Sequence, residues 1–146
     1  MSRIQRVVFD TSTLVSAALR IGSIPHQALL KASASFDVCA NAETLAELEK
    51  VLSRKKFDRY LDRESRTAFV ALIRHNAHLF STPHVLAVVE QPFSRDPDDN
   101  KFLALALAAE ADVLVSSDQD LLVLHPWRGI PIVRPAEFLD SLRALP

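Results

Sequence analysis

Hydrophobic residues along the chain occur in two patterns, short continuous runs and longer stretches with helical spacing. The continuous runs predict five buried strands, because apolar segments of this length bounded by polar residues are typical of a covered sheet. The strands are expected in RVVFD (6–10), FDVCA (36–40), HVLAVV (84–89), DVLVSS (112–117) and IPIV (130–133). The helical spacings predict helices over 14–20, 25–33, 41–54, 62–80, 98–110 and 135–145, with a short one in QDLLVL (119–124).

The order of these elements predicts the fold class. Strands that are separated by helices favour a mostly parallel sheet covered on both faces, which is a three-layer α/β/α sandwich. The chain has 146 residues, enough for a single domain over 1–146 with a sizeable core. Only two glycines occur, so neither a G-x-G-x-x-G dinucleotide loop nor a P-loop fits the sequence.

The composition bears on the cellular compartment, on membrane association and on attraction to polyanions. Cys39 is the single cysteine, which excludes an internal disulfide framework and fits a reducing compartment, so a cytoplasmic location is expected. The apolar run at 102–109 is far shorter than the roughly 18 residues that cross a bilayer, and the N-terminal residues lack the pattern of a signal peptide, so no membrane association is expected. The formal net charge of −1 gives no global attraction to a polyanion.

Acidic residues follow or precede the buried segments at three places. Asp10 ends the first strand, Asp118 follows VLVSS, and Asp98 and Asp99 precede an apolar helix. Because the carboxyl ends of parallel strands meet at one edge of the sheet, we expect Asp10 and Asp118 to face a common crevice. Like charges that share a crevice need a neutralising partner, so the pattern indicates a divalent metal site. Carboxylates without His or Cys partners favour Mg²⁺ or Mn²⁺.

A simpler interpretation stays open for some of these acids. Asp is strongly preferred at the start of helices, so Asp96, Asp98 and Asp99 can each be explained as a capping residue, and Asp120 as the first turn of the next helix. Asp10 is harder to explain in this way, since a carboxylate directly after three apolar strand residues is costly to bury without a partner.

Four segments together resemble the PIN domain family. VVFDTSTLVSAALR, ETLAELEKVLSRKKF, RDPDDNKFLALALAAEADVLVSSDQDLL and IPIVRPAEFL stand in the order of that family's motifs and cover nearly the whole chain. The match is strongest to the PIN-type toxins of bacterial and archaeal toxin-antitoxin pairs. The resemblance implies a PIN-like fold, a Mg²⁺- or Mn²⁺-dependent endoribonuclease that leaves a 5′-phosphate, a cognate antitoxin protein as partner, and a homodimer.

The family's acidic quartet falls by position on Asp10, Glu47, Asp99 and Asp118, as both catalytic and metal-binding residues. The resemblance implies that Asp10 and Asp99 are the principal ligands, that Glu47 positions a water or a second ion, and that Asp118 binds metal directly or through water. Helical geometry alone places Glu47 on the polar side of its helix and would not select it.

This chain departs from the family at two positions beside the acids. Ser12 stands where relatives commonly carry Asn, and Ser116 stands where they often carry Thr. Both residues keep a small polar group, so the departures bear on how the acids are oriented.

Substrate binding requires positive charge near the acids. Residues 54–66 form a locally basic stretch, and Arg20, Arg95 and Lys101 are candidates for other edges of the site. Phe57 and Tyr60 are candidates for stacking on bases. An ordinary solvated surface with aromatics packed into the core explains the same pattern equally well.

Several other functions compete with the ribonuclease. A haloacid-dehalogenase phosphatase would need a second aspartate where Ser12 stands, and a receiver domain would need its phosphoacceptor in a later strand. A PIN-like module without catalysis, serving only to bind proteins, is disfavoured by the four acids. A DNA or flap-type nuclease is the nearest alternative, because metal-assisted attack on a phosphodiester does not by itself read the 2′-hydroxyl.

Overall fold

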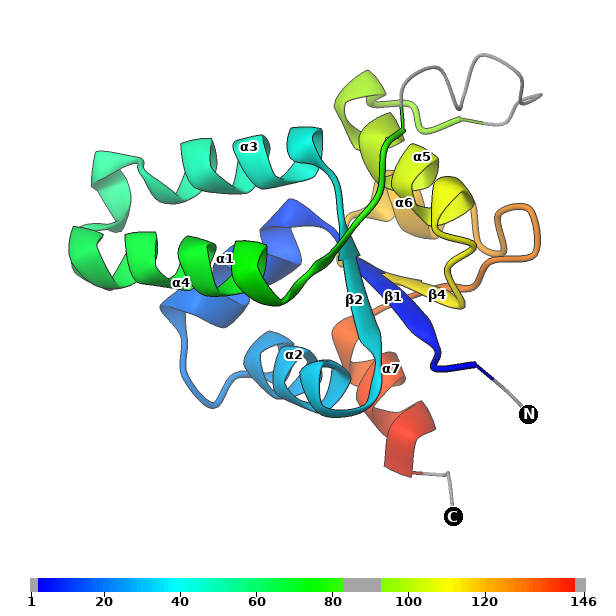
Figure 1. Ribbon diagram of the computed structural model, residues 1–146, viewed down its shortest axis with the longest axis horizontal. Helices are drawn as coiled ribbons and strands as arrows, with labels where there is room; N and C mark the ends of the chain where they lie inside the picture. Colours follow the sequence, from blue (N-terminus) through cyan, green and yellow to red (C-terminus); the bar gives the residue numbers. More distant parts are fainter. Residues whose placement is uncertain (1–2, 83–92, 144–146) are drawn as a thin grey trace.

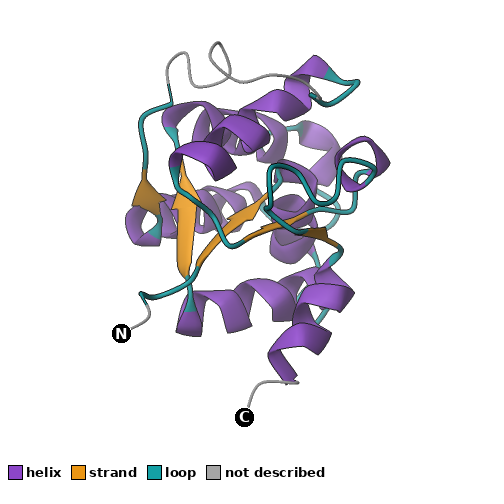
Figure 2. Ribbon diagram, turned by 90° about the vertical axis from the view of Figure 1, so that its right-hand side faces the viewer, coloured by secondary structure: helices purple, strands orange, loops and turns teal. Residues whose placement is uncertain are grey.

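The computed structural model describes residues 3–82 and 93–143, which form a five-stranded sheet between layers of helices (Figures 1 and 2). The strand order is β3-β2-β1-β4-β5, and every pairing in it is parallel. The strands are β1 (Arg6–Phe9), β2 (Asp37–Ala40), β3 (His78–Leu79), β4 (Val113–Val115) and β5 (Ile132–Val133). The prediction of an α/β/α sandwich with a parallel sheet is therefore confirmed.

The helices follow the strands along the chain. They are α1 (Thr11–Leu19), α2 (Ile24–Ser35), α3 (Ala42–Leu52), α4 (Arg63–Asn76), α5 (Asn100–Ala108), α6 (Gln119–Leu122) and α7 (Pro135–Arg143), with short 3₁₀ turns at Lys55–Phe57 and Pro97–Asp99. Side-chain hydrogen bonds cap the N-termini of several helices: Ser23 caps α2, Asp62 caps α4, and Asn41 forms a capping box with Thr44 at α3.

Alternation along β1 divides the core between the two faces of the sheet. Val8 packs on one side with Phe102 and Leu105 of α5 and with Leu121 of α6. Val7 and Phe9 point to the other side, where α2 and α7 cover the sheet, and the Phe138 ring lies edge-on to Phe9 with centroids 6.1 Å apart. A third cluster joins α1, α3 and α4, so these last two helices extend the molecule beyond the sheet (Figure 1).

The predicted helix over 62–80 differs most from the structure at its end. The helix predicted over 62–80 ends at Asn76, because the backbone turns at Ala77 and His78–Leu79 pairs with β2 as an edge strand. An ion pair of 3.2 Å between His78 and Asp37 joins these strands at the edge. The strand predicted at 84–89 lies outside the described residues.

The strand order creates a crevice at one position. From β1 the chain moves outward through β2 and β3, and then it returns across the sheet to β4 and β5 on the opposite side. The crevice at such a reversal lies beyond the carboxyl ends of the two strands that flank it, here β1 and β4. Asp10 is fixed at this place by its backbone N–H, which donates to the Val115 carbonyl at 3.1 Å.

Among the described residues, no helix has both the length and the apolar character that crossing a membrane would require.

Candidate metal centre at the carboxyl edge of the sheet

Asp10 is the most deeply buried of the candidate acids, with 3% of its surface exposed. Its carboxylate caps α1 by accepting from the Thr13 backbone N–H at 3.0 Å, and it accepts from the Ser116 hydroxyl at 2.5 Å. The Ser12 hydroxyl lies 3.3 Å from both carboxylate oxygens. Burial raises the pKa of Asp10 above its usual range, and the hydrogen bonds from Ser116, Thr13 and Ser12 offset part of that rise.

Ser116 links Asp10 to the next acid along the crevice. Its hydroxyl is fully buried; it donates to Asp10 and accepts from the Asp118 backbone N–H at 2.9 Å. The same hydroxyl therefore orients a carboxylate at the end of β1 and the backbone at the end of β4. Since Ser12 and Ser116 both donate to Asp10, the two departures from the family pattern still supply hydrogen bonds to the first acid.

Three carboxylates converge beside this link. Oxygens of Asp99, Asp118 and Asp120 all lie within 4.8 Å of one another. Asp118 caps α6 by accepting from the Asp120 backbone N–H at 2.9 Å, and Asp99 stands where the 3₁₀ turn passes into α5. These positions bring the starts of α5 and α6 together at the crevice.

The electrostatics of this cluster are unfavourable without a counterion. Burial, and then the neighbouring Asp118 carboxylate, raise the pKa of Asp99 to about 7. The Ser94 hydroxyl, 3.3 Å away, offsets part of this rise by hydrogen bonding to Asp99. A divalent cation would relieve the repulsion, and an all-oxygen ligand set fits Mg²⁺ or Mn²⁺.

The structure brings two of the four predicted acids, Asp99 and Asp118, into the cluster. Asp10 is outside this group of three, but Ser116 links it to Asp118 by hydrogen bonds. Glu47 is also outside this group and forms an ion pair with Lys101 of α5. The side chain of Glu47 is 28% exposed, so its helix turns it toward α5 and not into open solvent.

Asp120 is the member of the cluster that was not among the four selected acids. Its sequence signal was the D-Q-D spacing after β4, which the sequence alone explains equally well as the start of a helix. Asp98 is exposed, and Asp96, two residues earlier, accepts from its backbone N–H at 3.0 Å, as a capping residue does.

The basic stretch over 54–66 is partly structural. Arg66 is 1% exposed; its guanidinium donates to the carbonyls of Leu52, Arg54 and Leu61 and pairs with Asp58. Phe57 packs against the α1, α3 and α4 cluster, whereas Tyr60 is 52% exposed. Of the two aromatics, only Tyr60 is placed to meet a ligand.

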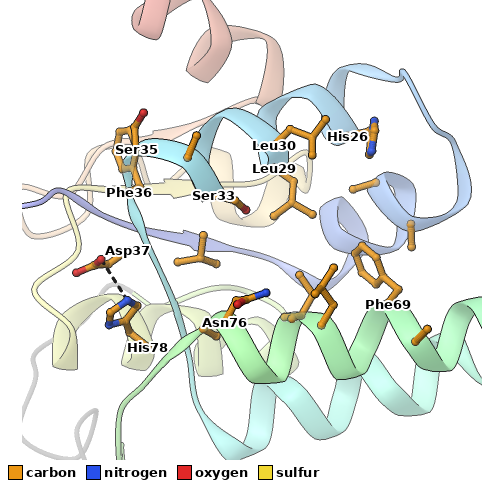
Figure 3. Close-up of a pocket in the computed structure, with 18 of the residues that line it drawn as sticks. His26, Leu29, Leu30, Ser33, Ser35, Phe36, Asp37, Phe69, Asn76 and His78 are labelled. Carbon is orange, nitrogen blue, oxygen red and sulfur yellow. Dashed lines mark ion pairs between the residues drawn. The ribbon is translucent and has the colours of Figure 1, made fainter.

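A large cavity in the described part of the chain is not lined by any of the candidate acids. It is an open groove of about 810 Å³ between α1, α2 and α4, beside β2 (Figure 3). Its lining is mainly apolar and includes Leu29, Leu30, Phe69, Leu72 and Ile73. Ile21, Leu30 and Leu72 are 86%, 57% and 59% exposed, so this apolar surface faces solvent.

Comparison with known proteins gives a family match over most of the chain. Residues 6–120 match the family model described as "PIN domain". No curated protein matches the sequence.

Solved structures share the fold at low sequence identity. PAE2754 from Pyrobaculum aerophilum superposes with a TM-score of 0.63 at 16% identity, covering 97% of this chain and 92% of that one. VapBC2 from Rickettsia felis, crystallised with a DNA fragment from its promoter, gives 0.59 at 11% identity over 89% and 98% of the two chains. VapC20 from Mycobacterium tuberculosis, described as a sarcin-ricin loop cleaving toxin, gives 0.53 at 17% identity over 82% and 95%.

Proposed function

This chain belongs to the PIN domain family, and we propose that it is a metal-dependent endoribonuclease, the toxin of a toxin-antitoxin pair. The observation that carries the proposal is the convergence of Asp99, Asp118 and Asp120 at the crevice between β1 and β4, with Asp10 linked to them through Ser116. Oxygen ligands gathered at this edge of a parallel sheet suit a hard divalent cation that also contacts a phosphate.

The residues divide between holding the ion and orienting its ligands. Asp99, Asp118 and Asp120 would hold Mg²⁺ or Mn²⁺ together with Asp10, and Glu47 on the neighbouring helix α3 would help to position a water. The bound ion would lower the pKa of a water and stabilise charge on the leaving oxygen of the phosphodiester. Ser116 and Ser12 keep the Asp10 carboxylate in one orientation, and the α5 helix fixes Asp99 at the mouth of the crevice.

The substrate class is tested with RNA and DNA side by side. Purified protein is expected to cut total RNA in the presence of Mg²⁺ or Mn²⁺, to stop in excess EDTA, and to leave single-stranded and flap DNA of matched length intact. Cleavage of the DNA at a rate equal to that of RNA would contradict the ribonuclease proposal and support the DNA nuclease. Full cleavage of RNA in EDTA would contradict the metal mechanism.

An antitoxin protein is the proposed partner, and we propose the apolar groove as its binding surface. The structural neighbours include VapBC2, a two-component complex, and FitAcB from Neisseria gonorrhoeae, which superposes with a TM-score of 0.53 at 16% identity over 89% and 98% of the two chains. The exposed Leu30 and Leu72 on facing helices offer contacts that an apolar segment of another chain would bury.

Co-expression tests this assignment. Expression of the chain alone is expected to arrest growth, and a small gene next to its own is expected to restore growth through a complex that copurifies. Leu72→Glu is expected to weaken that complex, whereas Lys50→Glu, an exposed change on α3, serves as the control. Equal binding by both variants would move the partner to another surface.

We also propose a homodimer in the cytoplasm, as the family resemblance implies. Light scattering on the purified chain is expected to give about twice the monomer mass of 16.2 kDa. A mass equal to that of the monomer at micromolar concentration would contradict the dimer.

A further inference from the structure

Lys101 carries a positive charge to the first turn of α5, two residues after Asp99. Its side chain is only 10% exposed, and its ammonium pairs with Oε2 of Glu47 on α3. The ammonium also lies 5.7 Å from the centroid of the Phe102 ring. The lysine is therefore packed between two helices at the edge of the acidic cluster.

This ion pair differs from the others that involve the same helices. The Arg74–Glu49 pair joins α3 to α4 with side chains that are 47% and 64% exposed, and Arg95 is 87% exposed where it reaches Asp120. Exposed pairs of this kind exchange easily with water and contribute little. A nearly buried ammonium instead needs its partner, because a charge removed from water is costly when left unpaired.

The pairing determines what Glu47 is free to do. Glu47 pairs with Lys101, which lies two residues after Asp99, and Glu47 is not a member of the group formed by Asp99, Asp118 and Asp120. A cation bound by Glu47 would stand next to the Lys101 ammonium, and two cations at contact distance with little water between them repel strongly. The Lys101 ammonium thus already supplies the positive charge at Oε2 of Glu47.

We propose that Lys101 neutralises Glu47 and thereby limits the acidic edge to one divalent ion, held by the Asp99, Asp118 and Asp120 side. This inference rests on the proposed metal site. It makes Lys101 a positioning residue that sets the number of ions, and it assigns Glu47 to holding Lys101 rather than to holding metal.

The number of ions is measured on metal-free protein by equilibrium dialysis against Mn²⁺, with free Mn²⁺ followed by its electron paramagnetic resonance signal. The wild-type chain is expected to bind one Mn²⁺, and Lys101→Met is expected to bind two. The double variant Lys101→Met with Glu47→Gln is expected to return to one, because the second site loses its ligand. Lys50→Met removes the same charge from an exposed position on α3 and is expected to bind one.

Each outcome decides between the two proposals. Two ions in the wild type, or one ion in a Lys101→Met chain whose circular dichroism is native, would overturn the inference and leave the metal site standing. An absence of Mn²⁺ binding in every variant would overturn the metal site and the inference together.

A further variant covers the case in which Lys101→Met does not fold. Lys101→Gln also removes the positive charge and is expected to bind two Mn²⁺. One Mn²⁺ in a natively folded Lys101→Gln chain would overturn the proposal.

Discussion

The acidic edge and the apolar groove differ in which side chains they expose to water. At the acidic edge, charged groups such as Asp10 and Asp99 are withdrawn from solvent. At the groove, apolar side chains such as Ile21 and Leu72 are left in solvent. In the isolated chain, both arrangements raise the free energy of the folded state. A bound ligand of matching chemistry would offset each of these costs.

The difference indicates which ligand belongs to which region. Buried carboxylates that repel one another gain from a cation, and a broad apolar surface gains from another apolar surface. Cavity size alone would direct attention to the groove, whereas the proposed metal site lies at the crevice between β1 and β4, where the carboxylates of Asp99, Asp118 and Asp120 meet. The two regions should therefore respond to different substitutions.

The largest effect is expected from removing charge at the acidic edge. Asp99→Asn and Asp10→Asn should each lower the rate of RNA cleavage by roughly 10²-fold or more, the scale of losing one electrostatic stabiliser in an active site. Single-turnover cleavage of an RNA oligonucleotide gives the rate. Asp98→Asn is the matched control, because Asp98 is adjacent and exposed. Unchanged rates in both Asp99→Asn and Asp10→Asn would remove these residues from the site.

The link between the strand ends is expected to matter for stability as well. Ser116→Ala leaves a buried Asp10 oxygen and the Asp118 N–H without their partner, and should lower the free energy of unfolding by about 1–3 kcal/mol. Urea unfolding of the metal-free protein measures the change. Ser117→Ala, at the exposed neighbouring position, is the control. A change below about 0.5 kcal/mol for Ser116→Ala would mean that water replaces the hydroxyl.

The affinity for Mn²⁺ should depend on pH through the Asp99 carboxylate, whose pKa is raised to about 7. The ion needs the deprotonated carboxylate, so Mn²⁺ affinity should fall by roughly tenfold for each pH unit below 7 and level off above about 8. Dialysis between pH 5.5 and 8.5 measures this, and a flat profile would contradict it.

The metal-free protein should show the reverse trend in stability. Because the folded-state pKa of Asp99 lies above the unfolded value of 3.8, the folded chain binds the extra proton between about pH 4 and 7. The contribution of Asp99 to the free energy of unfolding therefore falls as the pH rises through this window. Asp99→Asn should remove that slope, which chemical unfolding at several pH values can measure.

The smallest effect on stability is expected in the groove. Leu72→Glu changes a side chain that is already 59% exposed, so the free energy of unfolding should move by no more than about 0.5 kcal/mol. Urea unfolding checks this value, with Leu48→Ala as a contrast, since Leu48 is 1% exposed and should cost about 2–5 kcal/mol. A large loss in Leu72→Glu would show that the groove is packed within the chain itself.

The sequence predicts the central part of the fold well and its edge less well. The strands β1, β2 and β4 coincide with apolar runs because both faces of the sheet are covered. The edge strand β3 consists of two exposed residues after α4, and nothing in its composition separates it from the end of a helix. Pairing with β2 defines it, which is a contact between distant parts of the chain.

The same limit applies to the candidate site. Asp10 can be selected from the sequence because it directly follows a buried strand, and Asp118 because it comes soon after one, whereas Asp99 is selected over its neighbour Asp98 by its match to the family motif. Asp120 cannot be selected from the sequence, because it lies in the first turn of α6, where an aspartate is expected for the helix alone. The pair between Glu47 and Lys101 joins residues 54 positions apart, and no local pattern contains that contact.

The start of α1 at Asp10 and the start of α5 at Asp99 have a consequence for the order of events during folding. Each helix presents the positive end of its dipole to one of the acids, which lowers the cost of gathering negative charge before a counterion is present. We therefore expect the chain to reach its native shape in a chelating buffer, unlike small domains that collapse only around a bound metal. Loading with the cation would then be a separate, reversible event, open to control by the supply of divalent ions in the cell.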